Sequence, residues 1–242
     1  MSDSLNDSTP PTPQGPPASP ALLTPASSPG STFHSVPAWM TLVLVTAIGL
    51  VLDLWSKSWA FATINRAYPI DINRDIVLQG RQGEIIPRDA QRVVIDGLLE
   101  FKLVLNVGAV FGAGEGKRWL FIGVTIFAVA FGIFLFGYWT RAKDWLAHVA
   151  IGLLLAGGLG NLYDRIVFGC VRDFIHPFPT AQLPFGWHSR SGDTALWPYV
   201  SNVADKFLII GIGILLVHAW RIGASEKRGE KPVEKSQEKA AV

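Results

Sequence analysis

Residues 145–165 read WLAHVAIGLLLAGGLGNLYDR, an apolar run that ends in polar and charged residues. Gly152, Ala156 and Gly160 recur every four residues, so they share one face of a helix and allow a second helix to approach closely. The apolar part, residues 145–163, is long enough as a helix to cross a hydrocarbon core roughly 30 Å thick. This stretch therefore predicts a membrane-spanning helix packed inside a bundle.

Three further apolar runs have a similar length. The four predicted spans are residues 39–59, 119–139, 145–163 and 203–220, in a chain of 242 residues of which 49% are hydrophobic. Tryptophans fall at the ends of these spans, where an indole ring prefers the headgroup layer; they are Trp39, Trp59, Trp119, Trp139, Trp145 and Trp220. With a mean hydropathy of +0.31, the composition excludes an ordinary soluble domain.

Both ends of the chain lie outside the predicted bundle, which covers residues 38–220. Residues 1–37 are rich in Pro, Ser and Thr and contain no Lys or Arg, so we expect a disordered tail and not a secretory signal peptide. Residues 221–242 form a charged tail. The net charge of +2 gives no support for a nucleic-acid partner. A single cysteine, Cys170, without Cys/His metal spacing indicates no disulfide, metal or cofactor.

An even number of spans places both termini on one side of the membrane. The basic residues of the C-terminal tail and of the short turn 141–144 predict that this side is the cytoplasm. The connections 60–118 and 164–202 then lie on the outer side.

The first outer connection contains a strand pattern. Leu99, Phe101, Leu103 and Leu105 alternate with Glu100, Lys102 and Val104. An open sheet edge cannot lie in lipid. We therefore expect a mainly α membrane protein, a bundle of four transmembrane helices with a small extracytoplasmic β-sheet on its outer surface.

Several polar residues fall near the outer ends of the spans, where a buried charge is unfavourable. Asp53 and Lys57 are one turn apart and can pair, while Asn161, Asp164 and Arg165 share a face at the end of the third span. Each set has a structural explanation: an ion pair directed to the surface, and a pair of Asp164 with Arg165 where the helix ends. The alternative is that both sets support a polar site.

Two more carboxyl groups fall at the same end of the bundle. Asp173 follows the third span among apolar neighbours, and Asp205 lies three residues after Asn202 at the start of the fourth span. Asn202 and Asp205 could form only a helix cap, and Asp173 could be an ordinary loop acid. Asn106 and Gly108, after the predicted strand, could form only a turn.

The convergence of these groups on one half of a small bundle favours a single site. Two carboxyl groups a few ångströms apart share a proton, which leaves one acid and one base. This is the chemistry by which an aspartyl protease activates water.

Five motifs occur in an order and spacing that resemble lipoprotein signal peptidase (signal peptidase II), an intramembrane aspartyl protease family. They are Asp53 with Lys57, Asn-x-Gly-Ala-x-Phe at 106–111, Gly-Asn-x-x-Asp-Arg at 160–165, Val-x-Asp-Phe-Ile at 171–175 and Asn-x-Ala-Asp at 202–205. The resemblance covers about residues 39–220.

The resemblance implies that Asp173 and Asp205 are the catalytic pair, without a metal. Residues that would bind substrate or support the site are Asp53, Lys57, Asn106, Gly108, Asn161, Asp164, Arg165 and Asn202. The implied activity is an endopeptidase of the bacterial inner membrane that cuts diacylglyceryl-modified prolipoproteins just before the modified cysteine, near the outer leaflet. Membrane lipid would be a second partner, and we expect a monomer.

The chain departs from the usual pattern in its last motif and in one connection. Ser201 stands where similar proteins usually show Phe, and Lys206 where they show Ser. The stretch 176–196 is longer than usual, and we expect it to form an interfacial flap over the site.

Three other classes compete with this hypothesis. A small transporter or channel with an Asp/Asn/Arg path would need polar residues through the bilayer, whereas the second and fourth spans are almost free of charge. Serine and zinc hydrolases lack their GxSxG and HExxH signatures here, and presenilin-type proteases need more spans. A non-catalytic membrane scaffold would keep its function after loss of one carboxyl group.

Overall fold

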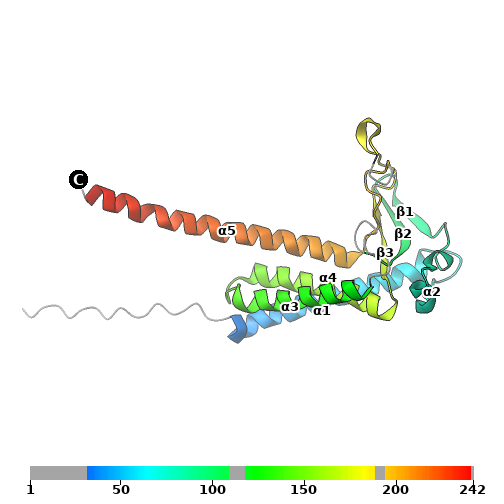
Figure 1. The fold of residues 1–242 in the computed structure, drawn as a ribbon, viewed down its shortest axis with the longest axis horizontal. Coiled ribbons are helices and arrows are strands. Elements are labelled where there is room, and N and C mark those ends of the chain that lie inside the picture. Colours follow the sequence, from blue (N-terminus) through cyan, green and yellow to red (C-terminus); the bar gives the residue numbers. More distant parts are fainter. Residues whose placement is uncertain (1–31, 109–117, 189–193, 241–242) are drawn as a thin grey trace, which may run out of the picture.

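The computed structural model describes residues 32–108, 118–188 and 194–240, with side chains as far as Ala224. Within this part, four helices are long and apolar enough to cross a membrane, and they run side by side (Figure 1). They are α1 (Val36–Thr63), α3 (Arg118–Tyr138), α4 (Trp145–Val167) and α5 (Val203–Ala240). The predicted four-helix membrane fold is confirmed.

The first boundary of the bundle lies earlier than predicted. Residues 32–37 were expected in the disordered tail, but a 3₁₀-helix at Thr32–His34 precedes α1, and the buried Thr32 hydroxyl donates to the carbonyl of Thr140. The Ser35 side chain caps α1 and Pro37 lies in its first turn, which fixes the start of the helix. Residues 1–31 lie outside the described residues, so for them the disordered tail stays a prediction.

The last helix continues past its predicted span. The apolar portion of α5 is Val203–Ala224, and its backbone remains helical to Ala240, so that α5 extends beyond the other three helices (Figure 1). The charged tail predicted at 221–242 is therefore a helical extension as far as residue 240.

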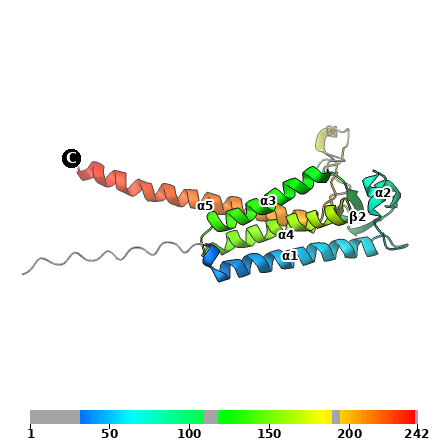
Figure 2. The same cartoon turned by 60° about the horizontal axis from the view of Figure 1, so that its bottom comes forward.

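Helix α4 lies at the centre of the bundle, in contact with α1, α3 and α5 (Figure 2). Its predicted small-residue face packs against α1: a Cβ at Gly152 would lie 2.9 Å from the Cβ of Val45. On a second face, a Cβ at Gly157 would lie 2.6 Å from the carbonyl oxygen of Ala204 in α5. Small residues thus bring α1 and α5 close to α4.

Three antiparallel strands form a sheet at one end of the bundle, in the order β1 (Gln91–Ile95), β2 (Leu99–Asn106), β3 (Val171–Pro177). Strand β2 is the predicted one and is confirmed. Asp173 was expected on a loop but lies on β3, opposite Val104. Five of the seven residues of β3 are buried, so both faces of the strand are covered. Its sequence therefore does not alternate between apolar and polar residues.

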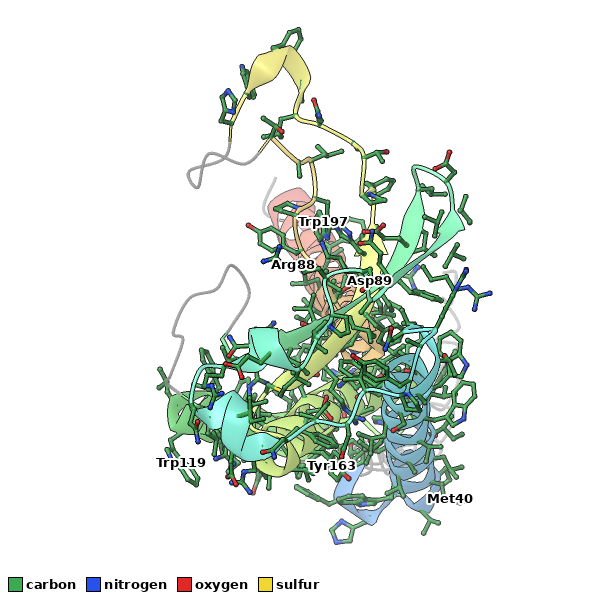
Figure 3. All side chains as sticks on the ribbon, turned by 90° about the vertical axis from the view of Figure 1, so that its right-hand side faces the viewer. Met40, Arg88, Asp89, Trp119, Tyr163 and Trp197 are labelled. Carbon is green, nitrogen blue, oxygen red and sulfur yellow. The ribbon has the colours of Figure 1, made fainter. Side chains whose placement is uncertain are left out.

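Short elements complete the sheet end. Helix α2 (Arg74–Leu78) and a 3₁₀-helix at Gln82–Glu84 follow α1. After β3, residues 178–188 and 194–196, here called the arm, run out and back with a 3₁₀-helix at Pro184–Gly186 near the tip (Figure 3). Residues 197–201, here called the strap, then lead into α5.

Candidate active site

The strap joins the two segments that carry Asp173 and Asp205. The carbonyl oxygen of Ser201 accepts from the backbone N–H groups of Phe174 and Ile175 at 2.9 and 2.7 Å, and Ser201 N donates to the carbonyl of Ile175 at 2.9 Å. These bonds fix β3 against the first turn of α5. The two carboxyl groups, 32 positions apart in the chain, are thereby brought to one place.

Asn202 connects the two carboxyl groups directly. Its Nδ2 donates to Asp173 Oδ1 at 2.6 Å, and its Oδ1 accepts from the backbone N–H of Asp205 at 3.0 Å. The backbone N–H of Asn202 in turn donates to Asp205 Oδ2 at 3.1 Å. This reciprocal pair is a capping box at the start of α5. Asn202 therefore both caps the helix and links the two carboxyl groups.

Two further asparagines hold the remaining carboxyl oxygens. Asn106, at the end of β2, donates from Nδ2 to Asp173 Oδ2 at 3.0 Å, and Asn161 in α4 donates from Nδ2 to Asp205 Oδ1 at 3.0 Å. The Gly108 N–H donates to Asn106 Oδ1 at 3.1 Å, which orients that amide. Each oxygen of the pair thus accepts a hydrogen bond from a positioned N–H group.

The environment of Asp173 changes its proton affinity. Burial raises the pKa of Asp173 to about 7, and the negative charge of Asp205 adds to this effect. The hydrogen bonds from Asn106 and Asn202 oppose it, because they stabilise the carboxylate. Asp173 can therefore hold a proton near neutral pH, as a catalytic acid requires.

A buried ionic network lies behind the pair. Lys57, with no exposed surface, contacts Asp53 Oδ2 at 2.7 Å and Asp164 Oδ2 at 3.3 Å, and donates to Asn161 Oδ1 at 3.0 Å. Asp53 Oδ1 accepts from the backbone N–H of Ala204 at 2.8 Å. Asp53 and Lys57 thus anchor α4 and the start of α5, and the alternative of an ion pair directed to the surface is wrong.

Asp164 pairs with Arg172 and not with Arg165, the partner expected if the pair served only to end the helix. Its Oδ1 accepts from Arg172 Nη2 at 2.8 Å and its Oδ2 from the backbone N–H of Arg172 at 3.0 Å. Sequence reasoning missed Arg172, which closes the bend between α4 and β3. Its only signal was its position next to Asp173. Arg165 instead donates to the carbonyls of Asn161 and Gly108 at 3.4 and 3.3 Å.

A cavity of about 710 Å³ opens in front of the carboxyl pair. The predicted residues that line it are Asn106, Gly108, Asn161, Arg165, Asp173 and Asp205. Asp53, Lys57, Asp164 and Asn202 lie behind this wall. Lys206 also lines the cavity, and its Nζ donates to the Ser201 hydroxyl at 2.8 Å, so it ties α5 to the strap.

The expected flap takes a different position. Among the described residues, the strap lines the cavity and the arm does not. The arm extends away from the bundle (Figures 1 and 3). The wall that 176–196 was expected to provide is supplied by residues 197–201, because the backbone bonds of Ser201 hold them against β3.

The chain is similar to proteins of a known family. The chain matches the family model described as signal peptidase II over residues 45–221. It is 36% identical over 179 residues to a lipoprotein signal peptidase of Dichelobacter nodosus, covering 72% of this chain and 90% of that protein. It is 32% identical over 157 residues to one of Desulfitobacterium hafniense, covering 64% and 88%.

A solved structure gives the same result for the fold. The structure, described as a bacterial membrane enzyme, superposes with a TM-score of 0.57 at 26% identity, covering 80% of this chain and 94% of that chain. The family match extends from α1 into α5 and includes every residue of the candidate site. The chain therefore belongs to the signal peptidase II family, a family of membrane proteases.

Proposed function

We propose that this chain removes signal peptides from prolipoproteins, and that Asp173 and Asp205 activate the water that cuts the peptide bond. The observation that carries the proposal is the position of the two carboxyl groups, which come from β3 and α5, line one cavity and are joined by Asn202. The relatives named lipoprotein signal peptidases support the same substrate class for this chain.

The two carboxyl groups take different roles. Asp205 is partly exposed and lies in the first turn of α5, where the helix dipole stabilises negative charge, so we assign it as the general base. Asp173 is only 2% exposed, and its pKa of about 7 keeps a proton available. Asp205 takes a proton from the attacking water while Asp173 donates a hydrogen bond to the scissile carbonyl. The leaving amine then receives a proton from the pair.

The cavity wall supports a lipid-bearing substrate. Leu105 and Val107 line it on the sheet side, and Leu208 and Ile209 line it from the membrane-spanning part of α5. A wall that continues into a spanning helix can contact acyl chains while the carboxyl pair reaches the peptide. We propose that the substrate carries diacylglycerol on a cysteine and that the bond just before this cysteine is cut.

We also propose an orientation. The protein spans a bacterial inner membrane with both termini on the cytoplasmic side, as the basic C-terminal residues predict. The carboxyl pair then lies near the outer leaflet. The site residues above come from one chain, so a monomer is sufficient. A cysteine in place of Lys235 should react with a membrane-impermeant reagent only from the cytoplasmic side, and one in place of Asp75 only from outside. Reaction of Lys235→Cys from outside in intact cells would contradict this topology.

The activity is tested with purified protein and a diacylglyceryl-modified prolipoprotein. Mass spectrometry should find a signal peptide that ends at the residue before the modified cysteine. The same prolipoprotein without lipid is the matched control and should be cut far more slowly. No product from the modified substrate, with protein that is shown to be folded, would contradict the proposed function. A product cut at another bond would contradict only the cleavage position.

A further inference from the structure

The arm carries large apolar side chains that the rest of the described structure does not cover. Phe185 is 90% exposed and Trp187 64%, and Phe178 and Leu196 are also exposed. Residues 178–187 contain no Asp, Glu, Lys or Arg. Outside the spanning helices, a cluster of exposed aromatic and apolar groups without charge marks an interaction surface.

Backbone bonds tie the base of the arm to the turn before β2 and pair the two segments of the arm with each other. Phe178 N donates to the carbonyl of Leu98 at 2.8 Å, Leu183 N to Thr194 at 2.8 Å and Leu196 N to Ala181 at 2.7 Å. The arm is therefore a hydrogen-bonded pair of segments and not a loop folded back on the bundle.

The tip of the arm has an unusual backbone. Phe185 has a φ of 61° and the next residue, Gly186, a φ of 67°. The left-handed region is uncommon for a bulky residue, and nothing in the packing of the described residues accounts for it, because the Phe185 ring makes so little contact. Strain of this kind is found at functional positions. It presents the Phe185 ring outward, and Trp187 lies beside it with ring centroids 6.1 Å apart.

The position of the arm relative to the bundle suggests its partner. The spanning helices define the direction of the membrane normal, and the arm leaves β3 near the level where α5 begins and runs across that direction (Figure 1). Viewed along the bundle, it extends past α5 and beyond the outline of the other helices (Figure 3). In a membrane crossed by the four helices, a segment at this position would overhang the lipid next to α5.

We propose that the arm is an interfacial anchor, in which Phe185 and Trp187 insert into the headgroup layer of the leaflet on the sheet side. Aromatic rings favour this layer, and apolar groups of interfacial segments enter it by about 5–10 Å. The first turns of α5 also carry exposed apolar residues, Ile209 at 62% and Ile212 at 51%, as a lipid-facing helix requires. Without charge in residues 178–187, insertion depends on apolar burial and not on attraction to anionic lipid.

The anchor would act on the cavity through the strap. Leu196 leads directly into Trp197, which lines the cavity and whose carbonyl lies 3.2 Å from His176 Nε2. The other ring nitrogen of His176 lies 2.7 Å from Glu100 Oε1 on β2. The base of the arm, the sheet and one wall of the cavity are thus one connected unit, which insertion of the tip would hold at the membrane surface.

Depth measurements test this proposal in vesicles of phosphatidylcholine. A polarity-sensitive fluorophore is attached to the cysteine of Phe185→Cys, and the same label on Trp187→Cys gives an independent second measurement. Cys170 is buried, so labelling of the unaltered protein gives the background. Val51→Cys, on a 65% exposed position of α1, is the lipid reference, and Asp75→Cys, on exposed α2, is the water reference.

We expect the fluorophore at Phe185→Cys to emit at a wavelength between those of the two references. Quenchers attached to lipid at headgroup level should quench it more than quenchers at the end of the acyl chains, and salt should change neither result. Emission equal to that of Asp75→Cys, without quenching by lipid, would overturn the proposal. Emission that shifts only when the protein-to-lipid ratio is raised would indicate contact between copies and would also overturn it.

Discussion

The substitution Asn106→Ala tests how the site sets the proton affinity of Asp173. Asn106 Nδ2 donates to Asp173 Oδ2 at 3.0 Å, and this bond lowers the pKa against the raising effects of burial and of Asp205. A hydrogen bond to a charged group contributes about 1.5–3 kcal/mol, and one pKa unit corresponds to about 1.4 kcal/mol. Loss of the bond should therefore raise the pKa of Asp173 by about 1 to 2 units.

The change is visible in the pH dependence of kcat/KM for a modified prolipoprotein. Asp173 acts in its protonated form, so the unaltered protein should lose activity as pH rises through about 7. In Asn106→Ala, this loss should move to higher pH by about 1 to 2 units, even if the maximal rate is lower.

Asn65→Ala is the matched control for this experiment. Asn65 is also buried, and its Nδ2 donates to the carbonyl of Tyr68 at 2.8 Å, outside the cavity. It should leave the alkaline limb of the profile in place. An alkaline limb that stays unchanged or moves to lower pH in folded Asn106→Ala would refute the reasoning about Asp173.

Two further substitutions test the support behind the pair, both by thermal unfolding in detergent. Gly160→Ala places a Cβ against the Asp53 carboxylate, so it should destabilise by about 1–3 kcal/mol, whereas Gly158→Ala, where a Cβ meets only ordinary contacts, should be neutral or stabilising. Equal unfolding temperatures for the two glycine variants would count against the close approach. Lys57→Met removes the cation between two buried carboxylates and should destabilise by about 3–5 kcal/mol. Lys143 is exposed, and Lys143→Met is the control that should leave the stability unchanged. A Lys57→Met protein as stable as this control would show that the network is not needed for folding.

The helices and β2 could be predicted because each carries a clear periodicity or a long apolar run. Strand β1 could not be, because all five of its residues are exposed and no buried face marks it. Strand β3 could not be, because it is buried on both faces and its sequence does not alternate.

The candidate site residues were chosen from their motifs, but their hydrogen-bond partners depend on tertiary contacts. Asn202 was weighed as either a cap or a site residue, and in the structure it both caps α5 and donates to Asp173. The pairing of Asp164 with Arg172 needs the bend between α4 and β3, which no local spacing predicts. The strap is held at the cavity by tertiary bonds such as those of Ser201 to β3, so the contribution of Trp197 could not be foreseen.

The central claim is that Asp173 and Asp205 act together, and it is tested most directly by the rates of Asp173→Asn, Asp205→Asn and the double variant. Asn keeps the size of each side chain and removes the ionisable group. Each single variant should cut modified prolipoprotein about 10²- to 10⁴-fold more slowly, and the double variant should be little slower than either, because the pair works as a unit. Asp75→Asn, an exposed acid on α2, should keep full activity. A single variant of Asp173 or Asp205, inserted at normal levels, that still cuts at near the original rate would contradict the account.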